Sequence, residues 1–130
     1  MYLSSTSIKT QNRAKGNVGE EIAIKYLLGQ GFKILVQNYS PKRNYQGGEV
    51  DIIAIRDDQI HAIEVKYRTS DTWGMGRESV NFRKQTSIRK ITAQYLRESD
   101  LLDKISCSHD IIEITKSGDS TELEHFENCF

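Results

Sequence analysis

Features that would assign this chain to several broad protein classes are missing from its sequence. No apolar run approaches the roughly 18 residues of a membrane span, and residues 1–12 are polar, without the apolar core of a secretory signal. Only two cysteines occur, Cys107 and Cys129, which are too few for a disulfide framework, and no Cys/His pair has zinc spacing. We therefore expect a cytoplasmic protein with reduced thiols and no membrane partner. We expect each of the three scattered histidines to be a strand residue rather than a ligand: His61, His109 and His125.

A net charge is also missing, because 18 Lys and Arg residues balance 18 Asp and Glu residues. The distribution is nevertheless uneven. Residues 66–97 contain eight Lys or Arg residues and two acids, whereas residues 98–130 contain nine acids and two lysines. A basic segment beside carboxylates suits a phosphate-rich partner that meets a metal. Solvated helix faces would produce part of the same asymmetry.

At 130 residues the chain is long enough for one domain with a real core. Residues 1–12 have the composition of a flexible tail, so we expect the domain at residues 13–130. Apolar periodicity and its breaks predict a helix, a strand, a hairpin, a second helix and two strands, at 13–28, 32–39, 47–66, 78–99, 109–115 and 123–127. This order, α-β-β-β-α-β-β, has no repeated βαβ pattern. It predicts an α/β sandwich in which helices flank a mixed central sheet.

The hairpin segment, residues 47–66, is the most informative part of the sequence. Two apolar strands are joined there by a short polar turn, which is a hairpin signal. If Ile55 pairs with Ile60 across that turn, the register brings Asp51 directly opposite Glu64. Because side chains alternate between faces with period two, both carboxylates then lie on one face of the sheet, about 5 Å apart at Cβ.

Two opposed carboxylates among apolar neighbours weaken a sheet and are costly to desolvate. A bound Mg²⁺ or Mn²⁺ would resolve both problems, because carboxylate oxygens suit these ions. Lys66 lies two residues beyond Glu64 on the same face, where it would meet an anion held by the metal. An Asp followed by Glu-x-Lys on the paired strand is the pattern of the PD-(D/E)xK nuclease superfamily. Glu-x-Lys alone is a weak motif that most often marks a solvated strand face.

Each predicted helix directs one polar residue along its packing face. Glu20 shares the stripe of Ala23 in the first helix, although a first-turn acid is also favoured by the helix dipole. Lys84 shares the apolar stripe of the second helix, with Gln85 beside it, while Arg83 is expected to face outward.

A set of short motifs in a fixed order resembles one known family. The motifs are Gly16-x-x-Gly19-Glu20-x-x-Ala23, Gly48-Glu49-Val50-Asp51-Ile52-Ile53-Ala54, Glu64-Val65-Lys66-x-Arg68, Val80-x-x-x-Lys84-Gln85, Ala93-x-Tyr95-Leu96 and Asn128-Cys129-Phe130. Over residues 13–130 the chain is similar to the bacterial UPF0102 (YraN-type) family, regarded as distant relatives of archaeal Holliday-junction resolvases in the PD-(D/E)xK superfamily. The family is named as uncharacterised, so the resemblance carries no demonstrated reaction.

The resemblance implies a restriction-endonuclease-like fold and a catalytic set of Glu20, Asp51, Glu64 and Lys66. Our hypothesis is a Mg²⁺- or Mn²⁺-dependent DNA endonuclease, in which the metal is held by Asp51, Glu64 and the Val65 carbonyl. Glu20 would contact the metal directly or through water, and Lys66 would orient the attacking water or stabilise the phosphorane-like transition state. A branched DNA substrate and a homodimer follow from family analogy alone.

Nucleic-acid contacts are expected from Lys84, Gln85, Arg68 and Arg83. The family usually has an arginine where this chain has Ser40, and the nearby Lys42 and Arg43 are candidates to replace it at a phosphate. Two alternatives stay open at this point. One is a nucleic-acid-binding protein that keeps the fold but does not cut, and the other is a structural domain whose acids are ion-paired to Lys66 and Lys84.

Overall fold

The computed structural model of this chain describes residues 18–41, 48–69 and 80–130. The expected tail over residues 1–12 and the loop residues Lys42 and Arg43 lie outside the described residues, so those expectations stay predictions. Neither described helix combines the length and apolarity needed to cross a bilayer.

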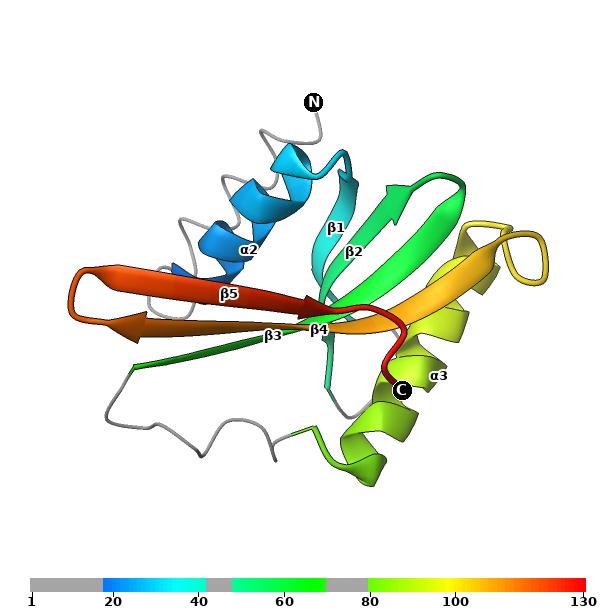
Figure 1. Cartoon of the computed structure of the whole chain (residues 1–130). Helices are drawn as coiled ribbons and strands as arrows, with labels where there is room; N and C mark the ends of the chain where they lie inside the picture. The colour runs from blue at the N-terminus through cyan, green and yellow to red at the C-terminus, as the bar shows by residue number, and fades with distance from the viewer. Residues whose placement is uncertain (1–17, 42–47, 70–79) are drawn as a thin grey trace.

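Within the described residues, two helices and five strands follow one another in the predicted order (Figure 1). The strands form one sheet in the order β1-β2-β3-β4-β5, and only β3 and β4 are parallel. The structure therefore confirms the α/β architecture with a mixed sheet. The elements are α2 (Val18–Gly29), β1 (Lys33–Tyr39), β2 (Val50–Arg56), β3 (Gln59–Thr69), α3 (Phe82–Glu98), β4 (Ser106–Ser117) and β5 (Ser120–Phe126).

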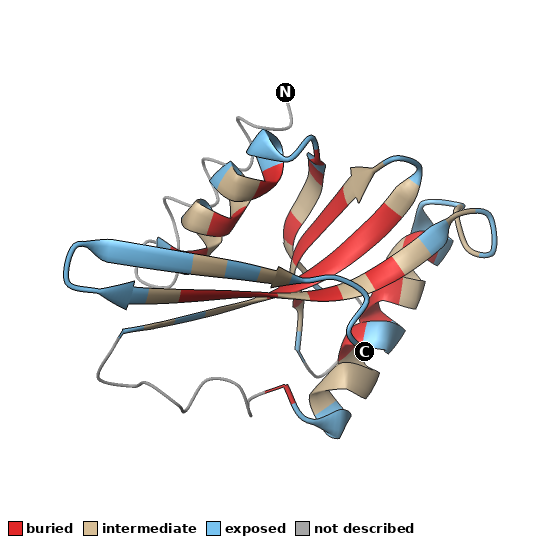
Figure 2. Cartoon of the chain, in the orientation of Figure 1, coloured by how far each residue is buried: buried red, intermediate tan, exposed pale blue. Residues whose placement is uncertain are grey.

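The two helices cover opposite faces of the sheet (Figure 1). Leu27 of α2 belongs to one apolar core with Ile52, whereas Ile88 of α3 belongs to the other core with Ile53. Adjacent residues of β2 thus point to opposite cores, as the period of two requires. Figure 2 shows that burial is concentrated in the central strands and in the helix sides that face them.

The β2–β3 hairpin has the predicted register, because Ile55 pairs with Ile60. Asp57 and Asp58 form the turn with φ values of 52° and 61°. Two consecutive positive φ values are what a two-residue type I′ turn needs, and short polar side chains such as Asp tolerate this region better than most. The turn therefore fixes the register on which the position of the carboxylates depends.

Some element boundaries differ from the predictions for local reasons. α3 begins at Phe82 rather than at residue 78, because Asn81 caps it: the Lys84 N–H donates a hydrogen bond of 2.9 Å to Asn81 Oδ1. β4 and β5 extend beyond their predicted lengths, since their pairing continues to Ser117 opposite Ser120. Polar, exposed strand ends carry no apolar alternation, so the sequence pattern does not reveal them.

Candidate functional site

Asp51 lies at the point where the hairpin ladder between β2 and β3 ends. The paired residues of this ladder end with Ile52 opposite Ile63. Just beyond them the Val65 N–H donates a hydrogen bond of 2.8 Å to Asp51 Oδ2. The carboxylate is therefore fixed to the neighbouring strand by its own side chain, on the face of the sheet that α3 covers.

Glu64 is the acid that the two lysines contact, and it is only 4% exposed. Its Oε2 lies 2.7 Å from Lys84 Nζ and 3.6 Å from Lys66 Nζ. Its Oε1 is buried and has no hydrogen-bond partner among the described residues. A buried carboxylate oxygen without a partner keeps its desolvation cost, so this oxygen would gain from coordinating a ligand.

The ionisable groups of this cluster shift one another's pKa values. Burial, and then the charge of Glu64, raises the pKa of Asp51 to about 7, although the Val65 N–H and Lys84 act to lower it. Burial, reinforced by the charge of Lys84, lowers the pKa of Lys66. Burial also acts to lower the pKa of Lys84, but the hydrogen bond with Glu64 and the charges of Glu64 and Asp51 together outweigh it, and the net shift is upward. Such mutual perturbation is typical of functional sites, although structural ion-pair networks also produce it.

Glu20 joins the cluster from the first turn of α2. Its Oε1 accepts a hydrogen bond of 3.0 Å from Asn38 Nδ2. Its negative charge is one of the contributions that raise the pKa of Asp51. The acid on the helical stripe therefore lies within electrostatic range of the hairpin acids, and it is at the same time a first-turn acid that the helix dipole favours.

The other residues predicted to contact nucleic acid differ in how many of their polar atoms already have partners in the fold. The side chain of Arg68 is 9% exposed, and its Nη2 lies 3.6 Å from Glu113 Oε1. Its Nε and Nη1 are buried and have no partner within the described residues. Gln85 Nε2 donates a hydrogen bond of 3.1 Å to the Val80 carbonyl, so this amide ties the first turn of α3 to the residue that precedes its N-cap. Arg83 is exposed, as predicted.

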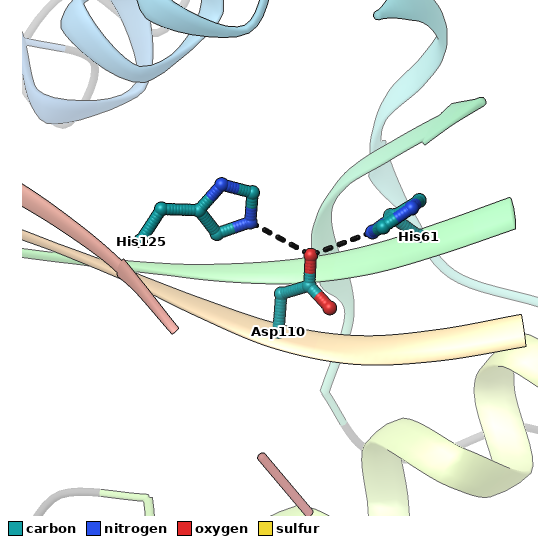
Figure 3. Close-up of side chains that lie close together, drawn as sticks. All are labelled: His61, Asp110 and His125. Atoms are coloured by element: carbon teal, nitrogen blue, oxygen red, sulfur yellow. Dashed lines mark hydrogen bonds and ion pairs between the residues drawn. The ribbon is translucent and has the colours of Figure 1, made fainter. Parts of the chain in front are cut away.

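A second polar cluster, on the face of the sheet that α2 covers, is absent from the sequence predictions (Figure 3). Asp110 Oδ2 lies 2.8 Å from His61 Nδ1 and 2.8 Å from His125 Nε2. These residues come from β4, β3 and β5, so one carboxylate joins three strands. The two histidines are strand residues, as expected, but they are not scattered in the fold. The three ligand atoms lie within 4.8 Å of one another, close enough to share a metal ion, although hydrogen bonds already link them directly.

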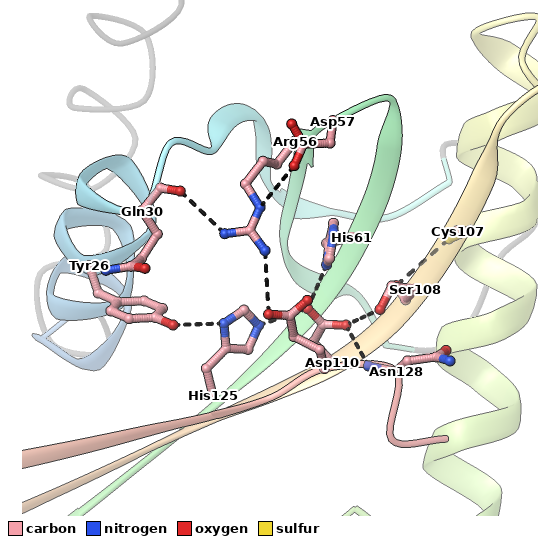
Figure 4. A network of polar contacts seen from close by, with 11 residues as sticks. Tyr26, Gln30, Arg56, Asp57, His61, Cys107, Ser108, Asp110, His125 and Asn128 are labelled. Carbon is pink, nitrogen blue, oxygen red and sulfur yellow. Dashed lines mark hydrogen bonds and ion pairs between the residues drawn. The ribbon is translucent and has the colours of Figure 1, made fainter.

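Further partners complete this second cluster (Figure 4). Asp110 Oδ1 accepts hydrogen bonds from Ser108 Oγ at 2.5 Å and from the Asn128 N–H at 3.1 Å. The Tyr26 hydroxyl lies 3.0 Å from His125 Nδ1. If both rings donate to the carboxylate and the Tyr26 hydroxyl donates to His125 Nδ1, all of these hydrogen bonds are compatible.

The fold and the first cluster define an α/β sandwich with carboxylates and lysines at the end of its central hairpin. This chain belongs to the family described as Uncharacterised protein family UPF0102, whose model matches residues 19–114. It is 38% identical to a UPF0102 protein of Alkaliphilus oremlandii over 92% of this chain and 99% of that protein. It is 40% identical to a UPF0102 protein of Clostridium acetobutylicum, over 92% of this chain and 95% of that protein. The predicted family is therefore confirmed, and the matched span contains Glu20, Asp51, Glu64, Lys66 and Lys84.

Proposed function

We propose that this chain is a metal-dependent endonuclease that hydrolyses phosphodiester bonds in DNA. The observation that carries the proposal is Glu64 Oε1, a buried carboxylate oxygen without a hydrogen-bond partner among the described residues. Beside it, burial and the charge of Glu64 raise the pKa of Asp51 to about 7. Two neighbouring carboxylates of this kind gain from a divalent cation, because the charge of the cation removes their repulsion.

The donor set fits Mg²⁺ or Mn²⁺. Asp51, Glu64 and the Val65 carbonyl offer the oxygen ligands that these ions prefer, and Glu20 would contact the ion directly or through water. When bound, such a cation polarises a phosphate oxygen and lowers the pKa of a bound water, so that hydroxide becomes available near neutral pH.

The basic residues supply positive charge where the phosphate would lie. Lys66, whose pKa is lowered by burial, would orient the attacking water or donate a hydrogen bond to a phosphate oxygen as negative charge develops on it. Lys84 Nζ, 2.7 Å from Glu64 Oε2, holds that carboxylate in place. Arg68 Nε and Nη1 lack partners among the described residues, so this guanidinium has donors left for a phosphate oxygen.

Two finer parts of the proposal rest on the family resemblance. We propose that the DNA is branched, and that the chain acts as a two-fold homodimer, since a two-fold junction is matched by a two-fold protein. Arg83 and the loop residues Lys42 and Arg43 are proposed to contact the DNA backbone.

The second candidate function is a nucleic-acid-binding protein that does not cut. Lys84 and Lys66 lie 2.7 Å and 3.6 Å from Glu64 Oε2. Lysines at these distances can neutralise the carboxylate without a metal, which is the observation that favours this candidate. A purely structural ion-paired cluster makes the same contacts but predicts no binding of nucleic acid.

Cleavage of labelled linear, flapped and four-way DNA in Mg²⁺, Mn²⁺ or EDTA tests the proposal. Glu64→Gln keeps the shape of the side chain and removes its charge, and Glu122→Gln on the exposed part of β5 is the matched control. Metal-dependent cutting that disappears only in Glu64→Gln would establish the nuclease, and the preferred substrate would give its class. Salt-dependent binding without cutting of any substrate, unchanged in Glu64→Gln, would establish the second candidate instead.

A further inference from the structure

A hollow of about 430 Å³ lies along the exposed side of the first turns of α3. Pockets that hold small ligands have volumes of roughly 300–1,000 Å³, so one nucleotide-sized group fits. The described residues that line the hollow provide a phenyl ring, two cations and two hydroxyls: Phe82, Arg83, Thr86, Ser87 and Lys90.

Phe82 is the most exposed large hydrophobic residue in the described part of the chain, at 77%. A single exposed phenyl ring is ordinary on a protein surface, but this ring borders a hollow together with Arg83 and Lys90. Both cations are exposed, and no described acid lines the hollow with them. An aromatic face beside cations is the combination that binds single-stranded nucleic acid.

The charges at the start of α3 also favour an anionic ligand. The first turn of this helix contains no acid but contains Arg83 and Lys84 in succession. Cations are unfavourable there, because the helix dipole places partial positive charge at the N-terminus. Glu64 compensates Lys84 at 2.7 Å, whereas no ion pair joins Arg83 to another described residue. A phosphate at Arg83 would remove the remaining repulsion.

The hollow adjoins the carboxylate cluster through two elements. Ser87 in its lining lies against Gly48, where an added Cβ would lie 3.3 Å from Ser87 Oγ, and Gly48 is three residues before Asp51 in the chain. Lys84, one residue along the helix from Arg83, lies 2.7 Å from Glu64. A polynucleotide with one phosphate at the carboxylates would therefore extend over the hollow with a neighbouring nucleotide.

We propose that this hollow is a nucleotide subsite, in which Phe82 stacks on an unpaired base and Arg83 and Lys90 bind the flanking phosphates. The subsite rests on the proposed function only in taking a nucleic acid as its ligand, and it does not require cleavage. A base stacks on a side chain only when it has left the duplex stack. The subsite thus selects substrates with an unpaired nucleotide beside the scissile bond. DNA and RNA both offer a base and a phosphate to these residues, so the preference between them is determined by comparing the two strands in the binding experiment.

Fluorescence anisotropy with EDTA present, which prevents metal-dependent cutting, tests the subsite. The probes are a labelled single strand of DNA, the same strand with one abasic position, its RNA equivalent and the perfect duplex. The variants are Phe82→Ala, Phe82→Trp and Arg83→Ala, with Leu28→Ala of α2 as the control at another exposed hydrophobic residue, 43% exposed. We expect Phe82→Ala to weaken single-strand binding about ten-fold, as loss of one stacked base does, while Phe82→Trp and Leu28→Ala retain it.

Two further results would support the subsite. Phe82→Ala should lose its effect on the abasic strand, because both changes remove the same stacking contact. Arg83→Ala should reduce the salt slope of binding by about 0.7, the contribution of one phosphate contact on a single strand. Unchanged binding in Phe82→Ala, with metal-dependent cleavage intact, would overturn the subsite and leave the proposed nuclease standing. No binding of any probe by the unmodified protein at low salt would overturn the subsite but not the nuclease, whose metal and branched substrate are absent from this assay.

Discussion

Asp51 and Asp110 are two carboxylates on opposite faces of one sheet, the first half-buried and the second fully buried, and they differ in their hydrogen-bond partners. Asp110 accepts hydrogen bonds from two imidazole rings, a hydroxyl and a backbone N–H. Asp51 accepts one from the Val65 N–H, and its neighbour Glu64 has an oxygen without a partner among the described residues. The α2 face of the sheet thus holds a completed cluster, whereas the α3 face holds one in which a carboxylate oxygen has no partner among the described residues.

The two pKa shifts follow from this difference. Burial acts to raise the pKa of both carboxyl groups. At Asp110 the hydrogen bonds of His125, His61 and Ser108 outweigh burial and hold the pKa well below its usual range. At Asp51 burial and the charge of Glu64 prevail, and the pKa rises to about 7. The hydrogen-bond donors around Asp110 and the charge of Glu64 beside Asp51 account for the opposite directions of the two pKa shifts. The contrast agrees with a structural role for the Asp110 cluster and with the proposed metal site at the Asp51 cluster.

Removal of Asp110 should have the largest effect on stability. Asp110→Ala leaves two histidines and a serine hydroxyl buried without their acceptor, so we expect a loss of about 3–5 kcal/mol, as for other broken buried polar networks. Urea unfolding at pH 7 measures it. Asp119→Ala in the exposed turn between β4 and β5 is the control, with a change within about 0.5 kcal/mol. A loss below about 1 kcal/mol for Asp110→Ala would contradict the structural role.

Removal of the charge of Asp51 should stabilise the protein, and the gain in the free energy of unfolding should depend on pH. The pKa of Asp51 is raised from its ordinary value of 3.8 to about 7. The folded state therefore binds more protons than the unfolded state between these values, and stability falls as the pH rises from about 4 to about 7. Asp51→Asn keeps an acceptor for the Val65 N–H and removes this dependence. In EDTA we expect a gain on the order of 2 kcal/mol at pH 8 and none at pH 4.

Urea unfolding of both proteins at pH 4, 6 and 8 measures this difference. Asp110 does not obscure it. The pKa of Asp110 is depressed in the folded state, so its contribution is present above its ordinary value of 3.8 and is lost only as the pH falls below that. Equal pH profiles for the parent protein and Asp51→Asn would contradict the raised pKa.

Addition of Mn²⁺ should show which of the two clusters binds the ion. If Asp51 and Glu64 hold the ion, a free concentration of ten times Kd stabilises the protein by about 1.4 kcal/mol, visible as a rise in Tm. Glu64→Gln should abolish the rise and His125→Gln should retain it, measured from the lower starting Tm of that variant. A rise that survives Glu64→Gln but disappears in His125→Gln would assign the ion to the histidine cluster instead.

The sequence was sufficient for the first cluster because its geometry is local. Alternation along one hairpin and a two-residue turn predict Asp51, Glu64 and Lys66 on one face. The observed register agrees as far as Ile52 opposite Ile63, and the predicted pair Asp51–Glu64 lies one step beyond the end of the ladder. Lys84 followed from its helical stripe, whereas the stripe alone left Glu20 open as a first-turn acid, and the family resemblance placed it in the set. The expected DNA, metal and dimer are not geometric consequences of these patterns, so they stay proposals.

The second cluster depends on contacts that no local pattern carries. His61 and Asp110 are 49 positions apart in the sequence, and they meet only because β3 and β4 pair in parallel with His61 opposite Ser108. The register of a parallel pair separated by a helix is set by packing rather than by a turn. One signal was present, since Asp110 shares its strand face with the buried residues Ile112 and Ile114. An acid on an apolar strand face needs a partner.

The smallest expected effect concerns the outermost hydrogen bond of the Asp110 cluster. Tyr26→Phe removes the hydroxyl that lies 3.0 Å from His125 Nδ1, and we expect a loss of about 1 kcal/mol in urea unfolding. Tyr39→Phe makes the same chemical change at an exposed hydrogen bond to Glu98 of 2.6 Å, where water can replace the lost partner. If burial rather than length decides how much a hydrogen bond adds to stability, loss of the longer bond of Tyr26 should lower the free energy of unfolding more than loss of the shorter bond of Tyr39. Equal losses in the two variants would contradict this.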